Sequence, residues 1–134
     1  MRSGFFVVTM LCISAPAIAA SPGERLAYVV GCINCHHQTP KEIINAPSLL
    51  IAKTYSIAEF KTLLKTGITN SGRNLPKISS IMGIVAVEQF SHMSDTEIES
   101  IYTFLTREWT QARASNEEAK ILGLYGAKRS EGKK

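Results

Sequence analysis

The sequence predicts an all-α protein, and three features support that prediction. Ser56 is followed three residues later by Glu59, and Ser94 by Glu97, which is the capping-box pattern of a helix start. Behind each box, apolar residues recur at helical spacing and predict one buried face on each helix. Residues 26–30 form a third, shorter apolar segment that follows a proline and a glycine.

The first half of the chain is expected to contain two helices. The first covers this short apolar segment and runs into residues 32–36. A break is expected at residues 39–40, which include a proline, and a long connection follows over residues 41–55. The middle helix starts at Ser56 and ends before Gly67, a residue type that suits the left-handed position after a helix.

The second half begins with a loop over residues 69–80, which contain turn-forming residues and a proline. Residues 84–90 are expected to form a short helix. The last well-marked helix starts after Ser94 and extends to about Gln111. Residues 112–134 are predicted to be an extension that is partly helical, with a basic, frayed end.

Residues 1–19 have the pattern of a secretory signal peptide. Arg2 gives a positive start, residues 5–13 form a short apolar run, and Ala17-Ile18-Ala19 has the spacing of a cleavage site. The mature chain would then begin near Ala20, and about 115 residues are enough for one domain. The apolar run is too short for a permanent membrane anchor, and an uncleaved anchor is the alternative.

Cys32-Ile33-Asn34-Cys35-His36 has the C-x-x-C-H spacing at which c-type haem is attached. Residues three and four apart share a helix face, so both cysteines can form thioethers with the vinyl groups of one haem. His36 can then direct its imidazole at the iron. The motif uses both cysteines of the predicted mature chain, and we predict one haem c held by Cys32 and Cys35.

A zinc site and a redox-active dithiol are two other interpretations of this motif. Zinc would need two more Cys or His ligands at suitable spacing, and only His37 and His92 are available. A thioredoxin-like dithiol would need a βαβ setting, and no such pattern surrounds the motif.

The iron needs a sixth ligand from later in the chain, and Met82 is the predicted one. It lies 46 residues after His36, enough for the chain to reach the other haem face. Met93 directly precedes the capping Ser94, where packing is its expected role, and His92 would give a bis-His haem. An open iron site is the remaining alternative. A thioether prefers ferrous iron, so methionine ligation raises the reduction potential.

With these features the chain resembles the class I monohaem cytochromes c over residues 23–109. The shared order is a short helix into C-x-x-C-H, a proline, a middle helix, a methionine loop and a capped C-terminal helix that crosses the first. The run from Met82-Gly83 to Leu105 resembles small bacterial members in particular, although many members have Met-Pro at this point. The resemblance implies the cytochrome c fold, with about three to five helices around one covalent haem, over a domain of residues 20–111.

The resemblance also implies that the backbone carbonyl near Pro47 accepts the Nδ1–H of His36, which would fix the ring and increase its basicity. A proline that only stops a helix is the alternative. Arg73 is the best candidate for a haem propionate, because a guanidinium matches a carboxylate; a solvated loop arginine is the alternative. Weaker candidates for that contact are Tyr55, Asn74, Lys77 and Trp109.

The charge balance is mildly basic, with 15 Lys and Arg against 11 Asp and Glu. Loss of Arg2 with the signal peptide would leave an excess of +3. This excess is too small to suggest nucleic acid, but it suits docking to an acidic protein.

We therefore expect a periplasmic one-electron carrier and not an enzyme. A periplasmic dehydrogenase would be the donor, and an oxidase or another cytochrome the acceptor. The periplasmic location follows from the resemblance, since c-type haem is attached outside the cytoplasmic membrane. The alternatives are a haem subunit of a larger dehydrogenase complex, and a five-coordinate haem enzyme or gas-binding protein.

Overall fold

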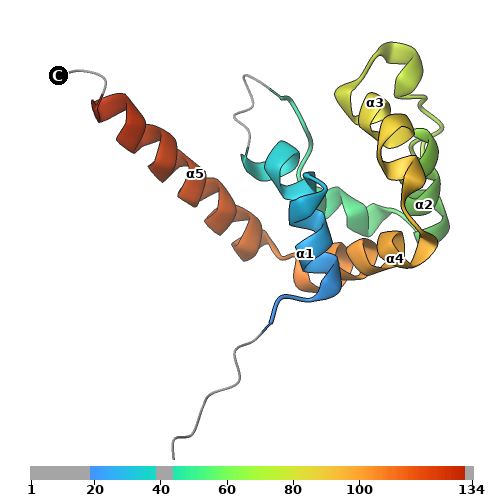
Figure 1. Ribbon diagram of the computed structural model, residues 1–134, viewed down its shortest axis with the longest axis horizontal. Helices are drawn as coiled ribbons and strands as arrows, with labels where there is room; N and C mark the ends of the chain where they lie inside the picture. The colour runs from blue at the N-terminus through green and yellow to red at the C-terminus, as the bar shows by residue number, and fades with distance from the viewer. Residues whose placement is uncertain (1–18, 39–43, 132–134) are drawn as a thin grey trace, which may run out of the picture.

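The computed structural model describes residues 19–38 and 44–131, and within these ranges its regular elements are helical (Figure 1). The only pairing of extended residues in these ranges is an isolated bridge between Ile68 and Asn74. The all-α prediction is therefore confirmed for the described part of the chain. The predicted signal peptide and the break at residues 39–40 lie outside it.

The first helix, α1, covers Pro22–Val29. Ser21 caps it by accepting a hydrogen bond from the backbone N–H of Glu24, and a proline at the first position has the φ that a helix start needs. The chain then turns at Gly31, whose φ is +90°, and the C-x-x-C-H motif continues into a π-helical turn over Asn34–Gln38. The predicted first helix is present, but it ends at Val29, and the turn at Gly31 separates it from the motif.

The predicted long connection before the middle helix is only partly irregular. Leu49–Thr54 form a 3-10 helix that Ser48 caps, and Leu49 and Ala52 are buried in it. The sequence does not reveal this element, because two turns of 3-10 helix are too short to show a periodicity.

Helices α2 (Ile57–Thr66) and α4 (Asp95–Thr103) both start at the predicted capping boxes. In α2 the backbone N–H of Ser56 donates to Glu59 Oε2 over 2.8 Å, and the backbone N–H of Glu59 donates to Ser56 Oγ over 3.3 Å. The box at α4 has the same two bonds. Gly67 ends α2 in the left-handed conformation, as predicted.

Helix α3 covers Ile81–Glu88, so it starts three residues earlier than the predicted helix over residues 84–90 and ends two residues earlier. The loop before it also contains a single 3-10 turn, Pro76–Ile78. Gly83 lowers the intrinsic helix propensity of this segment, which explains why the sequence favours a later start. As a result Met82 lies in the first turn of a helix and not in a loop.

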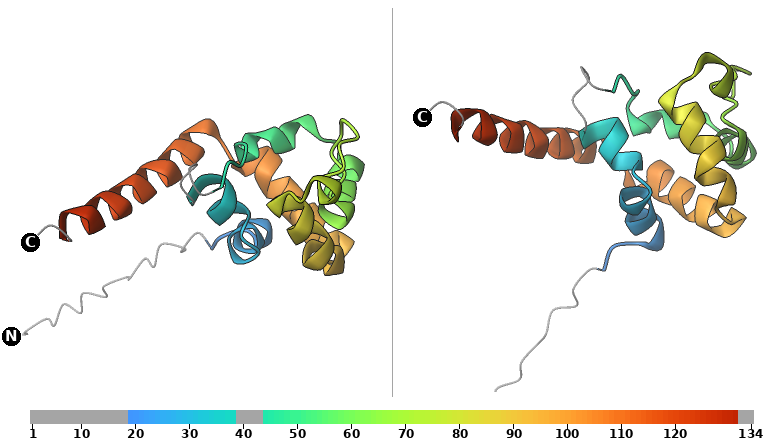
Figure 2. Two further views of the ribbon diagram at one scale, coloured as in Figure 1. Left: turned by 90° about the horizontal axis from the view of Figure 1, so that it is seen from above. Right: turned by 45° about the horizontal axis from the view of Figure 1, so that its top comes forward.

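The last predicted helix is divided in the structure. After α4 the chain forms a π-helical turn over Phe104–Glu108, and a separate helix, α5, covers Gln111–Glu131. Most of the predicted extension is therefore one helix of 21 residues, which includes residues 128–131 of the predicted frayed end. Figures 1 and 2 show α5 extending away from the other helices.

The start of α5 packs on the π-helical turn Asn34–Gln38 and reaches α1 through side chains. Arg113 forms an ion pair with Glu24, and Ala114 belongs to the buried core. Burial and a hydrogen bond to Glu117 raise the pKa of Tyr28 to about 12. The predicted domain boundary after residue 111 thus falls inside a helix whose first turns contact the domain.

Helices α1 and α4 cross at Gly23. A Cβ atom built on Gly23 would lie 1.9 Å from the carbonyl oxygen of Ser100 and 2.9 Å from Phe104 Cβ. Only glycine lets the two backbones approach this closely. The first helix and the capped helix α4 thus cross, as the family resemblance implies.

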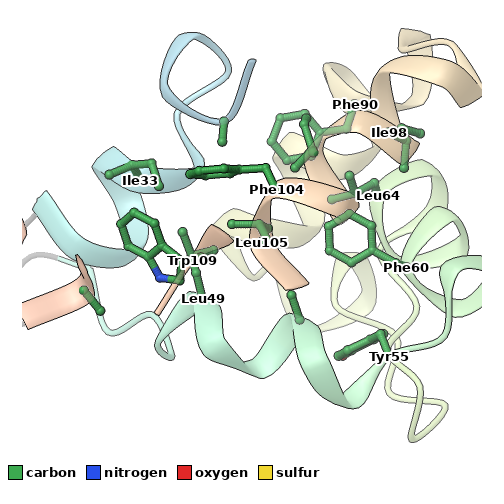
Figure 3. Close-up of a cluster of buried hydrophobic side chains, with 14 residues drawn as sticks. Ile33, Leu49, Tyr55, Phe60, Leu64, Phe90, Ile98, Phe104, Leu105 and Trp109 are labelled. Carbon is green, nitrogen blue, oxygen red and sulfur yellow. The ribbon is translucent and has the colours of Figure 1, made fainter. Parts of the chain in front are cut away.

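Buried side chains of the core connect the motif to the end of α4. Figure 3 shows Ile33, from the centre of the motif, beside Phe104, Trp109 and Leu49. Ile33, Phe104 and Trp109 are fully buried. No helix in the described ranges is long and apolar enough to cross a membrane.

Candidate functional site

The two motif cysteines are free thiols on a turn anchored by Ile33. Cys32 and Cys35 are only partly buried, whereas Ile33 between them is fully buried. The backbone N–H of Cys35 donates to the carbonyl of Gly31 over 3.0 Å, which closes the turn. The side chain of Ile33 therefore fixes the turn to the core, and Cys32 packs against the core cluster beside it.

The surroundings of Cys32 do not favour a redox-active dithiol. Burial raises the pKa of the Cys32 thiol to about 12, and the charge of Cys35 adds to this shift. The thiolate is the reactive form, and redox-active cysteines have a lowered pKa. Cys32 is thus held as a protonated thiol near neutral pH.

His36 is oriented by a hydrogen bond to the backbone of Pro47. Its Nδ1 lies 2.6 Å from the Pro47 carbonyl oxygen, which is the contact predicted for it. Because a carbonyl only accepts, Nδ1 carries the proton and Nε2 carries a lone pair. Burial lowers the pKa of His36 and favours the neutral ring, although the bond to Pro47 opposes this shift. A neutral imidazole with its other nitrogen hydrogen-bonded is the usual form of a metal-binding histidine.

His37 makes contacts that the sequence does not predict. Its Nε2 accepts a hydrogen bond from the backbone N–H of Leu49 over 3.1 Å, and its ring centroid lies 5.0 Å from that of Trp109. The position of His37 directly after the motif is the only indication in the sequence that it could have a role at this site, and the indication is weak. Its partner lies 12 residues away, in a segment whose path cannot be derived from local patterns.

Met82 lies on a different element from the motif. It is partly buried and packs against the core cluster. Its helix, α3, contacts mainly α2 and the neighbouring short helices, and Figures 1 and 2 show it set apart from the turn that follows α1. The contacts of the described residues therefore do not join Met82 directly to His36.

Close backbone packing fixes the start of α3. Gly83 is buried, and a Cβ atom on it would lie 2.4 Å from Pro76 N and 2.8 Å from the carbonyl oxygen of Leu75. The apolar side chains of Ile78, Ile81 and Ile84 are nevertheless exposed. The helix that carries Met82 is thus packed on one side and presents large apolar groups on the other.

The two alternative candidates for the sixth ligand, Met93 and His92, lie in a packed and an exposed position, respectively. Met93 is partly buried against the core, as expected for a packing role, and its backbone carbonyl accepts a hydrogen bond from Lys65 Nζ over 3.1 Å. His92 is exposed on a short 3-10 turn, Phe90–His92.

The residues that could contact a haem propionate lie on different segments of the fold. Arg73 is exposed in a turn, where its backbone forms hydrogen bonds with Thr69, and its side chain forms no ion pair with another described residue. Trp109 is fully buried, and its Nε1 has no hydrogen-bond partner among the residues that the structure covers. The carbonyl of the buried Tyr55 accepts a hydrogen bond from Tyr102. These residues are not brought together with the motif as one polar site.

The arrangement gives no support to a zinc site. Within residues 19–38 and 44–131, no group of three or more His, Cys, Asp and Glu side chains could hold a metal ion. Structural zinc needs four such ligands. A haem needs much less from the chain, namely two thiols for attachment and one or two axial ligands.

The chain matches no protein-family model, and no curated protein or solved structure is significantly similar to it. Its function is therefore inferred from its own residues.

Proposed function

We propose that this chain is a one-electron carrier that holds one haem covalently through Cys32 and Cys35, with His36 and Met82 as axial ligands. The hydrogen bond from His36 Nδ1 to the carbonyl of Pro47 carries the proposal. This bond leaves Nε2 free to act as the ligand atom. A C-x-x-C-H motif that served another purpose would not require a hydrogen-bond acceptor for the histidine. The cytochrome c fold is part of the same proposal.

The cysteines suit covalent attachment. Each thiol would add its S–H bond across one vinyl group, so that a C–S bond and a C–H bond form. The reaction needs no oxidant and releases no leaving group. Cys32 and Cys35 are free and partly exposed, as this addition requires, and both thiols would be consumed by it.

Met82 suits the sixth position because its helix presents exposed apolar side chains. An apolar cofactor can cover such side chains and remove them from water, which is favourable. A bound haem would supply one-electron chemistry as its iron alternates between the ferric and ferrous states. The chain would keep both axial ligands in place, exclude water from the iron and favour the ferrous state through the thioether.

Location and partners follow from the sequence. We propose export to the periplasm with removal of residues 1–19, and mass spectrometry of the exported chain tests this directly. A terminus near Ala20 is expected, and an intact Met1 in the membrane fraction would contradict it. The basic excess suits an acidic partner, with a dehydrogenase as donor and an oxidase or other cytochrome as acceptor.

A haem subunit of a larger complex is the second candidate, and the projection of α5 favours it (Figure 1). Isolated helices gain little stability without packing, so a helix that extends from the body suits a chain with a permanent partner. The size of the protein isolated from its native source separates a free carrier from a subunit.

The decisive experiment is expression together with the haem-attachment machinery. We expect haem staining to remain with the chain on a denaturing gel, and acid-acetone to extract no haem. The double variant Cys32→Ala/Cys35→Ala is the control and should lose the stain. Extraction of haem from the wild type would overturn the proposal. Binding of carbon monoxide to the reduced wild type would instead indicate the five-coordinate alternative.

A further inference from the structure

We propose that His37 is a positioning residue for the axial ligand His36, a role that rests on the proposed haem function. The two neighbouring histidines bind the same short segment, residues 47–49. His36 donates a hydrogen bond to the carbonyl of Pro47 over 2.6 Å, and His37 accepts one from the N–H of Leu49 over 3.1 Å. The segment is thus held at both ends by side chains of one turn.

Few rotatable backbone angles separate the two groups that form these hydrogen bonds, the carbonyl of Pro47 and the N–H of Leu49. The φ of Pro47 is fixed near −65° by its ring, and Ser48 alone lies between the carbonyl of Pro47 and the N–H of Leu49. A bond that fixes the Leu49 N–H therefore limits how far the Pro47 carbonyl can rotate. By holding Leu49, His37 keeps that carbonyl directed at His36.

The backbone N–H of Leu49 needs an acceptor from outside its own helix. It is the first residue of the 3-10 helix Leu49–Thr54, and the first N–H groups of a helix have no partner within it. The side chain of Leu49 is buried, so this donor would be costly to leave unpaired. His37 Nε2 satisfies it, while the adjacent N–H of Leu50 donates to Ser48 Oγ.

His37 is itself held in place by the core. Its ring packs at 53° against Trp109, which is fully buried. Trp109 follows the π-helical turn at the end of α4 and also packs against Phe104. The position of the Pro47 carbonyl is therefore linked through His37 to the most buried part of the molecule.

The expected consequence concerns the ligand strength of His36. A firm bond at Nδ1 makes the imidazole a stronger donor to the metal, which favours the ferric state. If His37 loses its acceptor, the Pro47 carbonyl can rotate and the bond to His36 weakens. The reduction potential should then rise, and the Nδ1 proton of His36 should exchange with solvent roughly fivefold faster.

Two variants separate positioning from packing. His37→Phe keeps an aromatic ring against Trp109 but has no acceptor, whereas His37→Gln keeps an acceptor at a similar reach but loses the ring. Gln111→Phe is the control for a newly placed phenylalanine, because Gln111 is exposed and is not a candidate ligand. For each haem-loaded protein, the reduction potential is measured, and proton NMR of the reduced state gives the exchange rate of the His36 Nδ1 proton.

We expect His37→Phe to raise both the potential and the exchange rate, with His37→Gln and Gln111→Phe close to wild type. Wild-type behaviour of His37→Phe together with a disturbed His37→Gln would show that His37 only packs, and would overturn the proposal. Wild-type values in both His37 variants would overturn it as well. A wild-type chain that fails to retain haem on a denaturing gel would instead overturn the proposed function, and this role of His37 with it.

Discussion

The side of the molecule that carries His36 and the side that carries Met82 are built by different interactions. On the His36 side, directional hydrogen bonds to the segment of Pro47 and Leu49 fix the rings of two histidines. On the Met82 side, α3 is fixed by close backbone contact, and Ile81 and Ile84 remain 52% and 51% exposed.

The difference follows from the chemistry of the two proposed ligands. An imidazole has a second nitrogen, through which the chain can orient it before any metal is bound. A thioether sulfur is only a weak acceptor, so a methionine must be placed by the backbone that carries it. The Met82 side should therefore be sensitive to a single added methyl group in the backbone contact, and the His36 side to loss of one hydrogen bond.

Both sides depend on the crossing of α1 and α4, and Gly23→Ala should have the largest effect. The new Cβ would lie 1.9 Å from the carbonyl oxygen of Ser100, so the helices must separate. Alanine gains about 1 kcal/mol of helix propensity over glycine, but overpacking of this kind costs roughly 1–3 kcal/mol and sometimes more. We expect a lower midpoint of urea unfolding for the haem-loaded protein.

Gly123→Ala is the matched control for this variant, because a Cβ atom on Gly123 in α5 would meet none of the described residues within 4 Å. It should leave the unfolding midpoint unchanged or raise it slightly. Equal midpoints for Gly23→Ala and the wild type would mean that the two helices do not cross this closely.

Met82→Ala should remove the proposed second axial ligand and leave the His36 side intact. The haem should stay covalently attached, the reduction potential should fall, and the reduced protein should bind carbon monoxide. The weak ferric absorption band of sulfur ligation should disappear. Absorption spectra with and without carbon monoxide, and a redox titration, measure these changes.

Met93→Ala is the comparison for Met82→Ala. It should keep the spectrum of the wild type and lose only packing energy, less than the roughly 2–5 kcal/mol of a fully buried methionine because Met93 is partly buried. Reversed behaviour of the two variants would move the sixth ligand to Met93. No spectral change in either variant would direct the search to His92.

Gly83→Ala should weaken sulfur ligation without removing the sulfur. Its Cβ would lie 2.4 Å from Pro76 N, so the start of α3 must move and carry Met82 with it. Gly123→Ala again serves as control, since both positions are helical and gain the same propensity. We expect partial loss of the sulfur band in Gly83→Ala alone, with unchanged exchange of the His36 Nδ1 proton. A full sulfur band in Gly83→Ala would show that this contact does not place Met82.

Local patterns predicted part of this structure well. The two capping boxes and the C-terminal glycine of α2 form through bonds within a few residues, and each is present where the sequence indicates. The hydrogen bond from His36 to Pro47 is also present, although only the family resemblance implied it.

The features that were missed depend on contacts between distant segments. The contact of His37 with Leu49 and Trp109 joins three separate parts of the chain. The early start of α3 relies on the close approach of Gly83 to the backbone of Leu75 and Pro76, which no periodicity reveals. Residues whose partners are near in the sequence were therefore predictable, and residues placed by the packed core were not.

The smallest expected effect is a loss of stability in acid from the capping boxes. The backbone and side chain of Ser56 lower the pKa of Glu59 by hydrogen bonding, and Ser94 does the same for Glu97. A carboxyl whose pKa is lower in the folded state stabilises the fold above its unfolded pKa, and this contribution is lost as the pH falls through the folded pKa. The loss should therefore begin below about pH 4.5 and remain modest, since both carboxyls are exposed.

Glu59→Gln/Glu97→Gln isolates this effect, because glutamine also completes a capping box but does not titrate. The thermal midpoint of the haem-loaded variant should fall less between pH 6 and pH 3 than that of the wild type. Glu88→Gln/Glu118→Gln removes two exposed helical carboxylates outside both boxes and so matches the change in net charge. Equal slopes for the double variant and the wild type would show that the boxes act as neutral caps. Acid sensitivity would then arise elsewhere, for example at Asp95, whose pKa is lowered by hydrogen bonds from Lys65 and Lys61.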